Sequence, residues 1–339
     1  MDLSQADDAL GRVEKLMTEK DYEAAIALLQ TISPGGPRDE QRQRLLAECR
    51  FRVFEASPPT PRQSGAWPTN VDDPFAAIVG IPEIHARDLD LASLSAGIRM
   101  HGALIVRGLL DDARASELVE GIKTAMAARD AWKADRTSRS PYYARMNLPG
   151  TIANARDWVE MGGVWTADSP HMLEKVIAMF DSIGALDVIE QYFGERPVMS
   201  VSKSTLRCVP HTIDKADWHQ DGAFLGTDIR SVNIWLSLSH CGRDASGLEV
   251  YPRRVEHILP TGVGGAIFKW SLGPETVAEA VRDVGTESPI FAPGDAIIFD
   301  HLFLHRTGLP KGMTKDRYAI ESWFFAPSGY PKDSGPLMV

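Results

Sequence analysis

Two histidines and one aspartate have the types and spacing needed to bind a metal ion. His219 and Asp221 are two residues apart, so on an extended strand both side chains point to the same face. A second histidine, His305, follows far downstream. Two imidazoles and one carboxylate on one side of a metal leave its other coordination positions open, as non-haem Fe(II) oxygenases require. These three residues therefore predict a non-haem Fe(II) site.

Arg317 is the fourth residue with clear chemical potential. It follows His305 by 12 residues (317 − 305) and opens a strand-like run over residues 317–323. The planar guanidinium group can hold a carboxylate through two parallel hydrogen bonds, so Arg317 could bind a dicarboxylate. Together with the metal-binding set, it suggests an Fe(II)- and 2-oxoglutarate-dependent oxygenase.

The His-x-Asp spacing is common in proteins, and its context gives it weight. Strand-like runs follow it at residues 232–238, 247–252 and 294–300. From about residue 80 to 328 the chain resembles the phytanoyl-CoA dioxygenase-like family of Fe(II)/2-oxoglutarate-dependent oxygenases. One segment departs from the family: where members often have Pro-Gly-Ser-His, residues 252–257 read Pro-Arg-Arg-Val-Glu-His.

The resemblance implies a role for each residue of the site. His219, Asp221 and His305 would bind iron, Arg317 would bind the distal carboxylate of 2-oxoglutarate, and the Thr307 hydroxyl would assist. The cofactors would be Fe(II), 2-oxoglutarate as cosubstrate, and O₂. The reaction would hydroxylate an unactivated C–H of a small metabolite or natural-product intermediate, with release of succinate and CO₂. Retention of Asp221 argues against the halogenase variant of this chemistry.

Alternative assignments exist for several residues. His301 competes with His305 as the distal ligand, although only His305 has the family's usual interval to Arg317. A zinc hydrolase could instead combine His211 with His219 and Asp221. We expect His211, His240 and His257 to be loop or surface histidines.

The expected roles of two residues on the strand at 231–238 depend on its register. Asn233 and Trp235 share one face of their strand and would border a cosubstrate pocket only if that face points inward. Ser202 and Ser204 lie on the strand before His219, where family members often contact 2-oxoglutarate. Arginines at 136, 139, 145, 253 and 254 hint at an anionic substrate, although loop arginines are commonly solvated or ion-paired.

Composition narrows the class of protein. The chain is 44% hydrophobic and 24% charged with a net charge of −10, which is typical of a globular protein and makes nucleic acid an unexpected partner. Cys49, Cys208 and Cys241 are too few and too widely spaced for a disulfide framework. We see no signal peptide or membrane-spanning run, and we expect a cytoplasmic protein with a small-molecule substrate.

The pattern of hydrophobic residues divides the chain into three parts. Residues 1–56 have helical periodicity and include one tetratricopeptide-like helical hairpin, residues 57–78 read as a linker, and residues 79–339 form the catalytic domain. One such hairpin is too little for a stable array, so it should pack on the main domain or on a second subunit as a homodimer contact. The alternative function is a non-catalytic scaffold that recruits a protein partner through this hairpin.

The expected fold is α+β, with a double-stranded β-helix (jelly-roll) core, flanking helices and the small N-terminal helical hairpin. Residues 94–100 should end a helix, 102–110 form a buried strand, and 111–127 a helix. Residues 130–166 form a long irregular stretch that is either an active-site lid or a loop packed on the sheet. Ser169 should cap a helix that begins at Pro170, and another helix should run to residue 193. The expected core elements are strands at 198–207, 231–238, 247–251, 265–270, 296–299 and 317–325, and a helix at 275–282.

Overall fold

The structure is a computed structural model of one α+β chain. Most of the expected linker, and part of the stretch 130–166, lie outside the residues that it describes. The described residues are 2–36, 38–58, 72–146, 156, 159–160, 162–331 and 334–339. Within them, no helix combines the length and apolar character needed to cross a membrane. All three cysteines are free.

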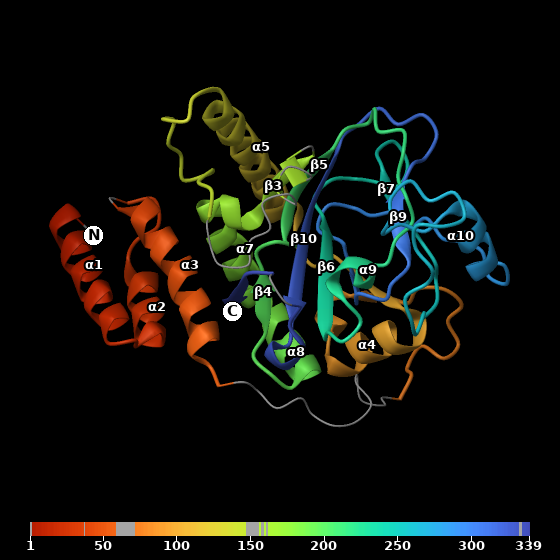
Figure 1. Ribbon diagram of the computed structural model, residues 1–339, viewed down its shortest axis with the longest axis horizontal. Coiled ribbons are helices and arrows are strands. Elements are labelled where there is room, and N and C mark those ends of the chain that lie inside the picture. The colour runs from red at the N-terminus through yellow and green to blue at the C-terminus, as the bar shows by residue number, and fades with distance from the viewer. Residues whose placement is uncertain are drawn as a thin grey trace.

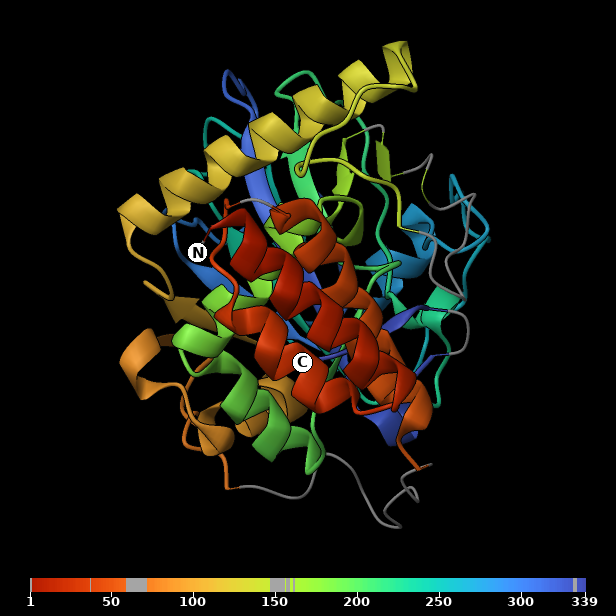
Figure 2. The same ribbon diagram turned by 90° about the vertical axis from the view of Figure 1, so that its left-hand side faces the viewer.

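Three helices form the N-terminal region: α1 (Leu3–Thr18), α2 (Tyr22–Thr31) and α3 (Asp39–Ala56). They lie side by side over one face of the molecule (Figure 2). Helix α3 packs against α7 (Pro170–Ser182) and against β11 (Pro336–Met338) near the C-terminus. Arg42 on α3 forms a bidentate ion pair with Glu174 on α7, and Arg50 donates to the Met338 carbonyl at 2.8 Å. The region therefore packs on the rest of its own chain.

A helix, a strand and a second helix lead into the main sheet, as predicted. Helix α4 (Leu91–Ala96) continues as a π-turn to His101, and β2 (Ala103–Arg107) follows. Helix α5 (Asp112–Ala134) begins after Asp111, whose side chain accepts a hydrogen bond from the Arg114 backbone N–H at 2.8 Å. This N-cap hydrogen bond explains why the acidic position starts the helix.

The large sheet has the strand order β1-β2-β8-β6-β10-β4-β11, with β5 also paired to β10 and β3 paired to β5. Among the strand pairs of the described residues, only β1–β2 is parallel. Strand β10 is the longest, and its expected bounds are confirmed. The strands are β1 (Glu83–His85), β3 (Gly163–Trp165), β4 (Val198–Ser200), β5 (Thr205–Val209), β6 (Ser231–Ser237), β8 (Ala296–Phe299) and β10 (Arg317–Phe325).

A small sheet of two antiparallel strands, β7 (Gly247–Val250) and β9 (His305–Gly308), lies beside the large sheet, to the right of β6 in Figure 1. Alternate residues of the large sheet face opposite ways. Ile234 and Ile320 pack with α4, α5, α7 and α8 (Ala185–Phe193), whereas Trp235 and Trp323 belong to the cluster that contains Leu248 of the small sheet. We call the second side the inner face.

Two of the predicted strands were wrong, and two helix predictions were confirmed in part. Residues 265–270 form turns rather than a strand, because Gly264 and Gly265 both adopt positive φ and break the extended run. Residues 198–207 are two strands, β4 and β5, separated by a turn at 201–203. The helix predicted at 275–282 is α10 (Pro274–Ala280). Ser169 occupies the N-cap of α7, but its side chain makes no capping hydrogen bond among the described residues.

Candidate metal centre

The structure brings His219, Asp221 and His305 together. One ligand atom from each lies within 4.8 Å of those of the other two, and the His305 Nε2 to Asp221 Oδ2 distance is 3.7 Å. His219 and His305 lie opposite each other on adjacent extended segments, whose backbone N–H groups donate to each other's carbonyls at 3.0 and 3.1 Å. Asp221 directly precedes the short helix α9 (Gly222–Leu225). The two paired segments and the start of α9 therefore bring the three side chains together.

Both histidines present the correct nitrogen to a metal. His219 Nδ1 lies 3.1 Å from the Asp217 carbonyl, and His305 Nδ1 lies 3.0 Å from the Phe303 carbonyl. A carbonyl can only accept, so each Nδ1 carries a proton, and in the neutral ring it is then Nε2 that has the lone pair for a metal. Burial, and secondarily the neighbouring His219, lower the pKa of His305 to about 4. His305 is therefore neutral near pH 7, as a metal ligand must be.

Gln220 fixes the loop that carries His219 and Asp221. Its side chain points away from the two ligands and is fully buried. The Nε2 amide donates to the carbonyls of Leu302 (2.7 Å) and His257 (3.1 Å), and Oε1 accepts from the Leu259 backbone N–H at 2.8 Å. Sequence reasoning did not single out Gln220. The period of two, which put His219 and Asp221 on one face, also puts Gln220 on the opposite face.

Gly222 allows the close approach of the metal-binding loop to the segment before β9. A Cβ atom at this position would lie 2.5 Å from Ile258 Cδ1 and 3.0 Å from His301 Cδ2. The Gly222 backbone N–H also donates to the His301 carbonyl at 2.8 Å. A larger residue would push Asp221 away from the two histidines.

Arg317 is a buried cation with an unused donor. It begins β10, and its Nη1 crosses to the small sheet, where it donates to the Gly247 carbonyl at 2.7 Å. Gly247 precedes Leu248, the β7 partner of Thr307, so Arg317 reaches the part of the small sheet that carries Thr307. Among the described residues, Nε has no hydrogen-bond partner and no carboxylate pairs with Arg317. Burial lowers its pKa to about 10. A buried guanidinium without an anion indicates an anionic ligand.

The two residues of β6 that were expected to border a cosubstrate pocket lie on the inner face. Asn233 and Trp235 point inward, and the Asn233 Oδ1 atom has no partner among the described residues. Trp235 lies under the Arg317 guanidinium, 5.3 Å from the ring centroid. The two serines on the strand before His219 instead make structural hydrogen bonds. Ser202 donates to the Ser334 carbonyl at 3.2 Å, and Ser204 Oγ accepts from the Trp323 backbone N–H at 3.2 Å.

The competing histidines lie outside the metal-binding group. His301 Nδ1 contacts Ser231 Oγ at 2.9 Å, and His211 pairs with Asp316 at 2.8 Å on the surface. Neither belongs to the one group of potential metal ligands in the described part of the chain. Arg254 also has a structural role, because it forms an ion pair with the buried Asp300 at 2.6 Å. His305, rather than His301, therefore meets His219 and Asp221.

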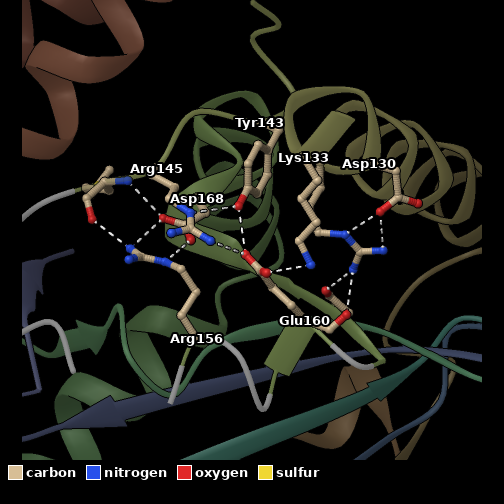
Figure 3. Close-up of polar contacts among 10 residues, drawn as sticks. Asp130, Lys133, Tyr143, Arg145, Arg156, Glu160 and Asp168 are labelled. Carbon is tan, nitrogen blue, oxygen red and sulfur yellow. Dashed lines mark hydrogen bonds and ion pairs between the residues drawn. The ribbon is translucent and has the colours of Figure 1, made fainter. Parts of the chain in front are cut away.

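Polar side chains hold the described part of the stretch 130–166, together with the residues that follow it up to Asp168, against the rest of the fold (Figure 3). Arg156 and Asp168 form a buried ion pair at 2.6 Å, and a second group of polar contacts gathers nearby around Glu160. The Glu160 carboxylate forms ion pairs with Lys133 at 2.7 Å and Arg145 at 3.1 Å, and it accepts a hydrogen bond from the Tyr143 hydroxyl at 2.8 Å. These contacts favour a loop packed on α5 and β3 over a lid for the residues involved.

Comparison with known proteins assigns no family. No family model matches the chain, and no curated protein matches it. Similar solved structures include EctD from S. alaskensis with 2-oxoglutarate and 5-hydroxyectoine, at 17% identity over 70% of this chain and 78% of that chain, with a TM-score of 0.47. EvdO2 from Micromonospora carbonacea var. aurantiaca, complexed with 2-oxoglutarate, is 19% identical over 71% and 90% of the two chains, with a TM-score of 0.41. SnoK, a non-heme alpha-ketoglutarate dependent carbocyclase from nogalamycin biosynthesis, is 12% identical over 72% and 87%, with a TM-score of 0.44. Likeness this remote carries no assignment of activity, which must come from the site.

Proposed function

We propose that the protein is an Fe(II)- and 2-oxoglutarate-dependent oxygenase that hydroxylates an unactivated C–H of a small molecule. The observation that carries the proposal is the combination of two sites. One is a group of two imidazoles and one carboxylate whose possible ligand atoms lie within 4.8 Å of one another, a donor set that would leave other coordination positions of a metal open. The other is Arg317, which is buried without a carboxylate among the described residues and contacts the small sheet that carries His305.

The residues present fit this cofactor pair. His219, Asp221 and His305 would hold Fe(II), and Arg317 would bind the distal carboxylate of 2-oxoglutarate with its free Nε–H, assisted by the Thr307 hydroxyl. Bound Fe(II) and 2-oxoglutarate would supply, with O₂, the oxidative decarboxylation that yields succinate, CO₂ and a hydroxylated product. The task of the chain is to orient these groups and to keep water from them.

The arrangement of the strands supports a jelly-roll core for the proposed domain 79–339. The inner face of the large sheet packs on the small sheet, and bridges at His219–His305 and Trp218–Leu272 extend the pairing next to β9. A metal site between two facing sheets suits the phytanoyl-CoA dioxygenase-like subtype that the sequence resembles. The N-terminal region 1–56 would then be an appendage, separated by a linker at 57–78.

Succinate formation tests the function without knowledge of the substrate. Purified protein is incubated in air with Fe(II), ascorbate and 2-oxoglutarate, and succinate is quantified against time. We expect slow turnover in the wild type, because the cosubstrate is consumed even when no substrate is coupled, and none in Asp221→Ala. The Asp244→Ala variant, which breaks an ion pair with the exposed Lys315, is the matched carboxylate control and should retain turnover. Equal succinate in wild type and Asp221→Ala would contradict the proposal and leave the scaffold alternative.

A further inference from the structure

Three charged side chains stand on or beside the inner face, next to the metal centre. Glu321 lies on β10 and Arg207 on β5, and their side chains remain 27% and 23% exposed although they sit at the middle of the sheet. Lys203 belongs to the turn between β4 and β5. Partial exposure at the middle of a sheet means that a space lies in front of these side chains.

Glu321 is already compensated by its neighbours. Its Oε2 accepts a hydrogen bond from the Thr205 hydroxyl at 3.1 Å, and its Oε1 lies 3.7 Å from Arg207 Nε. The carboxylate therefore has both a hydrogen-bond donor and a cation. At 3.7 Å the ion pair is not a hydrogen bond, so Arg207 Nε keeps an unused donor, but the two charges balance each other.

Lys203 differs, because its ammonium group has neither an ion pair nor a hydrogen bond among the described residues. The Lys203 Nζ atom instead lies over the face of the Phe224 ring, 3.6 Å from the ring centroid. Burial lowers the pKa of Lys203, and the carboxylates of Asp221 and Glu321 oppose that effect from a distance. Since Asp221 would be committed to a metal and Glu321 to Arg207, the Lys203 charge remains unbalanced.

An aromatic wall continues from Lys203 to the metal centre. Phe224 meets Trp270 edge to face at 5.8 Å, and Trp270 meets the His219 ring in the same way at 5.7 Å. Phe268 stacks flat on Trp270 at 5.0 Å. Phe224 and Phe268 remain 42% and 36% exposed, so the wall has apolar surface left to cover.

We propose that Lys203 binds an anionic oxygen group, a carboxylate or a phosphate, of an organic substrate whose apolar body lies along Phe224, Trp270 and Phe268. This inference rests on the proposed function, since it supplies the substrate class for that site. Lys203 is then a specificity-determining residue: it selects the anion, and the aromatic wall selects the attached apolar group.

Small aromatic probes test the inference. Protein loaded with Zn(II) and 2-oxoglutarate, which cannot turn over, is titrated with phenylacetate, phenyl phosphate and phenethylamine while tryptophan fluorescence is followed. We expect at least one of the two anions to bind about tenfold or more tightly than the amine, because a charge-assisted contact in a partly buried site has that magnitude. Lys203→Met should remove this preference, and Lys203→Arg should retain it. The exposed Lys311→Met is the control and should behave like the wild type.

Two results would overturn the inference. One is that neither anion binds better than the amine, or that Lys203→Met keeps the preference. The other is that Lys203→Met weakens 2-oxoglutarate binding as much as Arg317→Met does in an anaerobic titration, which would assign Lys203 to the cosubstrate. Failure of the proposed function is distinguishable from both, because it would abolish 2-oxoglutarate binding in the wild type while probe binding could be measured on the protein alone.

Discussion

His219 and His305, which are 86 residues apart (305 − 219), hold each other in place through their own backbones. Each donates its backbone N–H to the other's carbonyl, at 3.0 and 3.1 Å, and their rings lie 4.4 Å apart. The strand pairing that closes this part of the fold is thus the same contact that assembles the metal centre.

Replacement of Arg317 should weaken cosubstrate binding and leave metal binding intact. Arg317→Met removes the buried cation, so we expect the affinity for 2-oxoglutarate to fall about 100-fold; Arg317→Lys, which keeps the charge but loses the fork, should cost about tenfold. Isothermal titration of the Zn(II)-loaded protein measures both. Arg306→Met is the control, because Arg306 points to the opposite side of β9 and pairs with Glu249. Equal affinities in all variants would remove Arg317 from the site.

Gly222→Ala should weaken the metal centre while the protein stays folded. The added methyl group would meet Ile258 and His301, so the loop must move and carry Asp221 with it. We expect the affinity for Zn(II) to fall about tenfold, measured by competition with a chelating dye. Gly11→Ala on the exposed side of α1 has nothing within 4 Å and is the control. Wild-type affinity in Gly222→Ala would show that the loop tolerates the side chain.

The metal-free protein should lose stability as the pH falls below about 6.5. Burial lowers the pKa of His305 from its ordinary value of 6.5 to about 4, so between these values the unfolded chain binds a proton that the folded chain does not. The contribution of His305 to the free energy of unfolding is therefore complete above pH 6.5 and declines toward pH 4. Urea unfolding from pH 4.5 to 7.5 should show a steeper decline for the wild type than for His305→Gln. Equal slopes in the two proteins would show that His305 does not carry this pH dependence.

Breaking the buried ion pair at Arg156 should destabilise the fold. Asp168→Asn leaves the buried guanidinium without its counter-charge, which costs about 3–5 kcal/mol in typical proteins. Arg52→Met, which breaks only exposed pairs with Glu48 and Glu55, should cost less than about 1 kcal/mol. Urea unfolding at pH 7 compares the two. A similar, small loss in both would mean that water reaches the Arg156 pair.

The sequence was most informative where a strict period applied. The spacing of His219 and Asp221 predicted that the two would share a face, because side chains of an extended strand alternate whatever lies across from them. The strand-like residues at 317–325 predicted the bounds of β10. The choice of His305 over His301 agrees with the structure, in which His305 lies together with His219 and Asp221.

Features that depend on distant partners could not be predicted in this way. The run at 265–270 has strand-like residues, but two glycines with positive φ turn it, and its Trp270 packs on His219 instead. Gln220 has no signal of its own until the carbonyls of His257 and Leu302 are near it. The inward register of Asn233, left open by alternation, was decided by the packing of Trp235 against the small sheet.

The most direct test of the account is the anaerobic visible absorbance of the protein with Fe(II) and 2-oxoglutarate. We predict a weak metal-to-ligand charge-transfer band in the wild type that saturates at one equivalent of Fe(II). The band should disappear in Asp221→Ala and weaken in Arg317→Lys, because one residue holds the metal and the other the cosubstrate. A well-folded wild type that shows no band would contradict the assignment of this site to Fe(II) and 2-oxoglutarate.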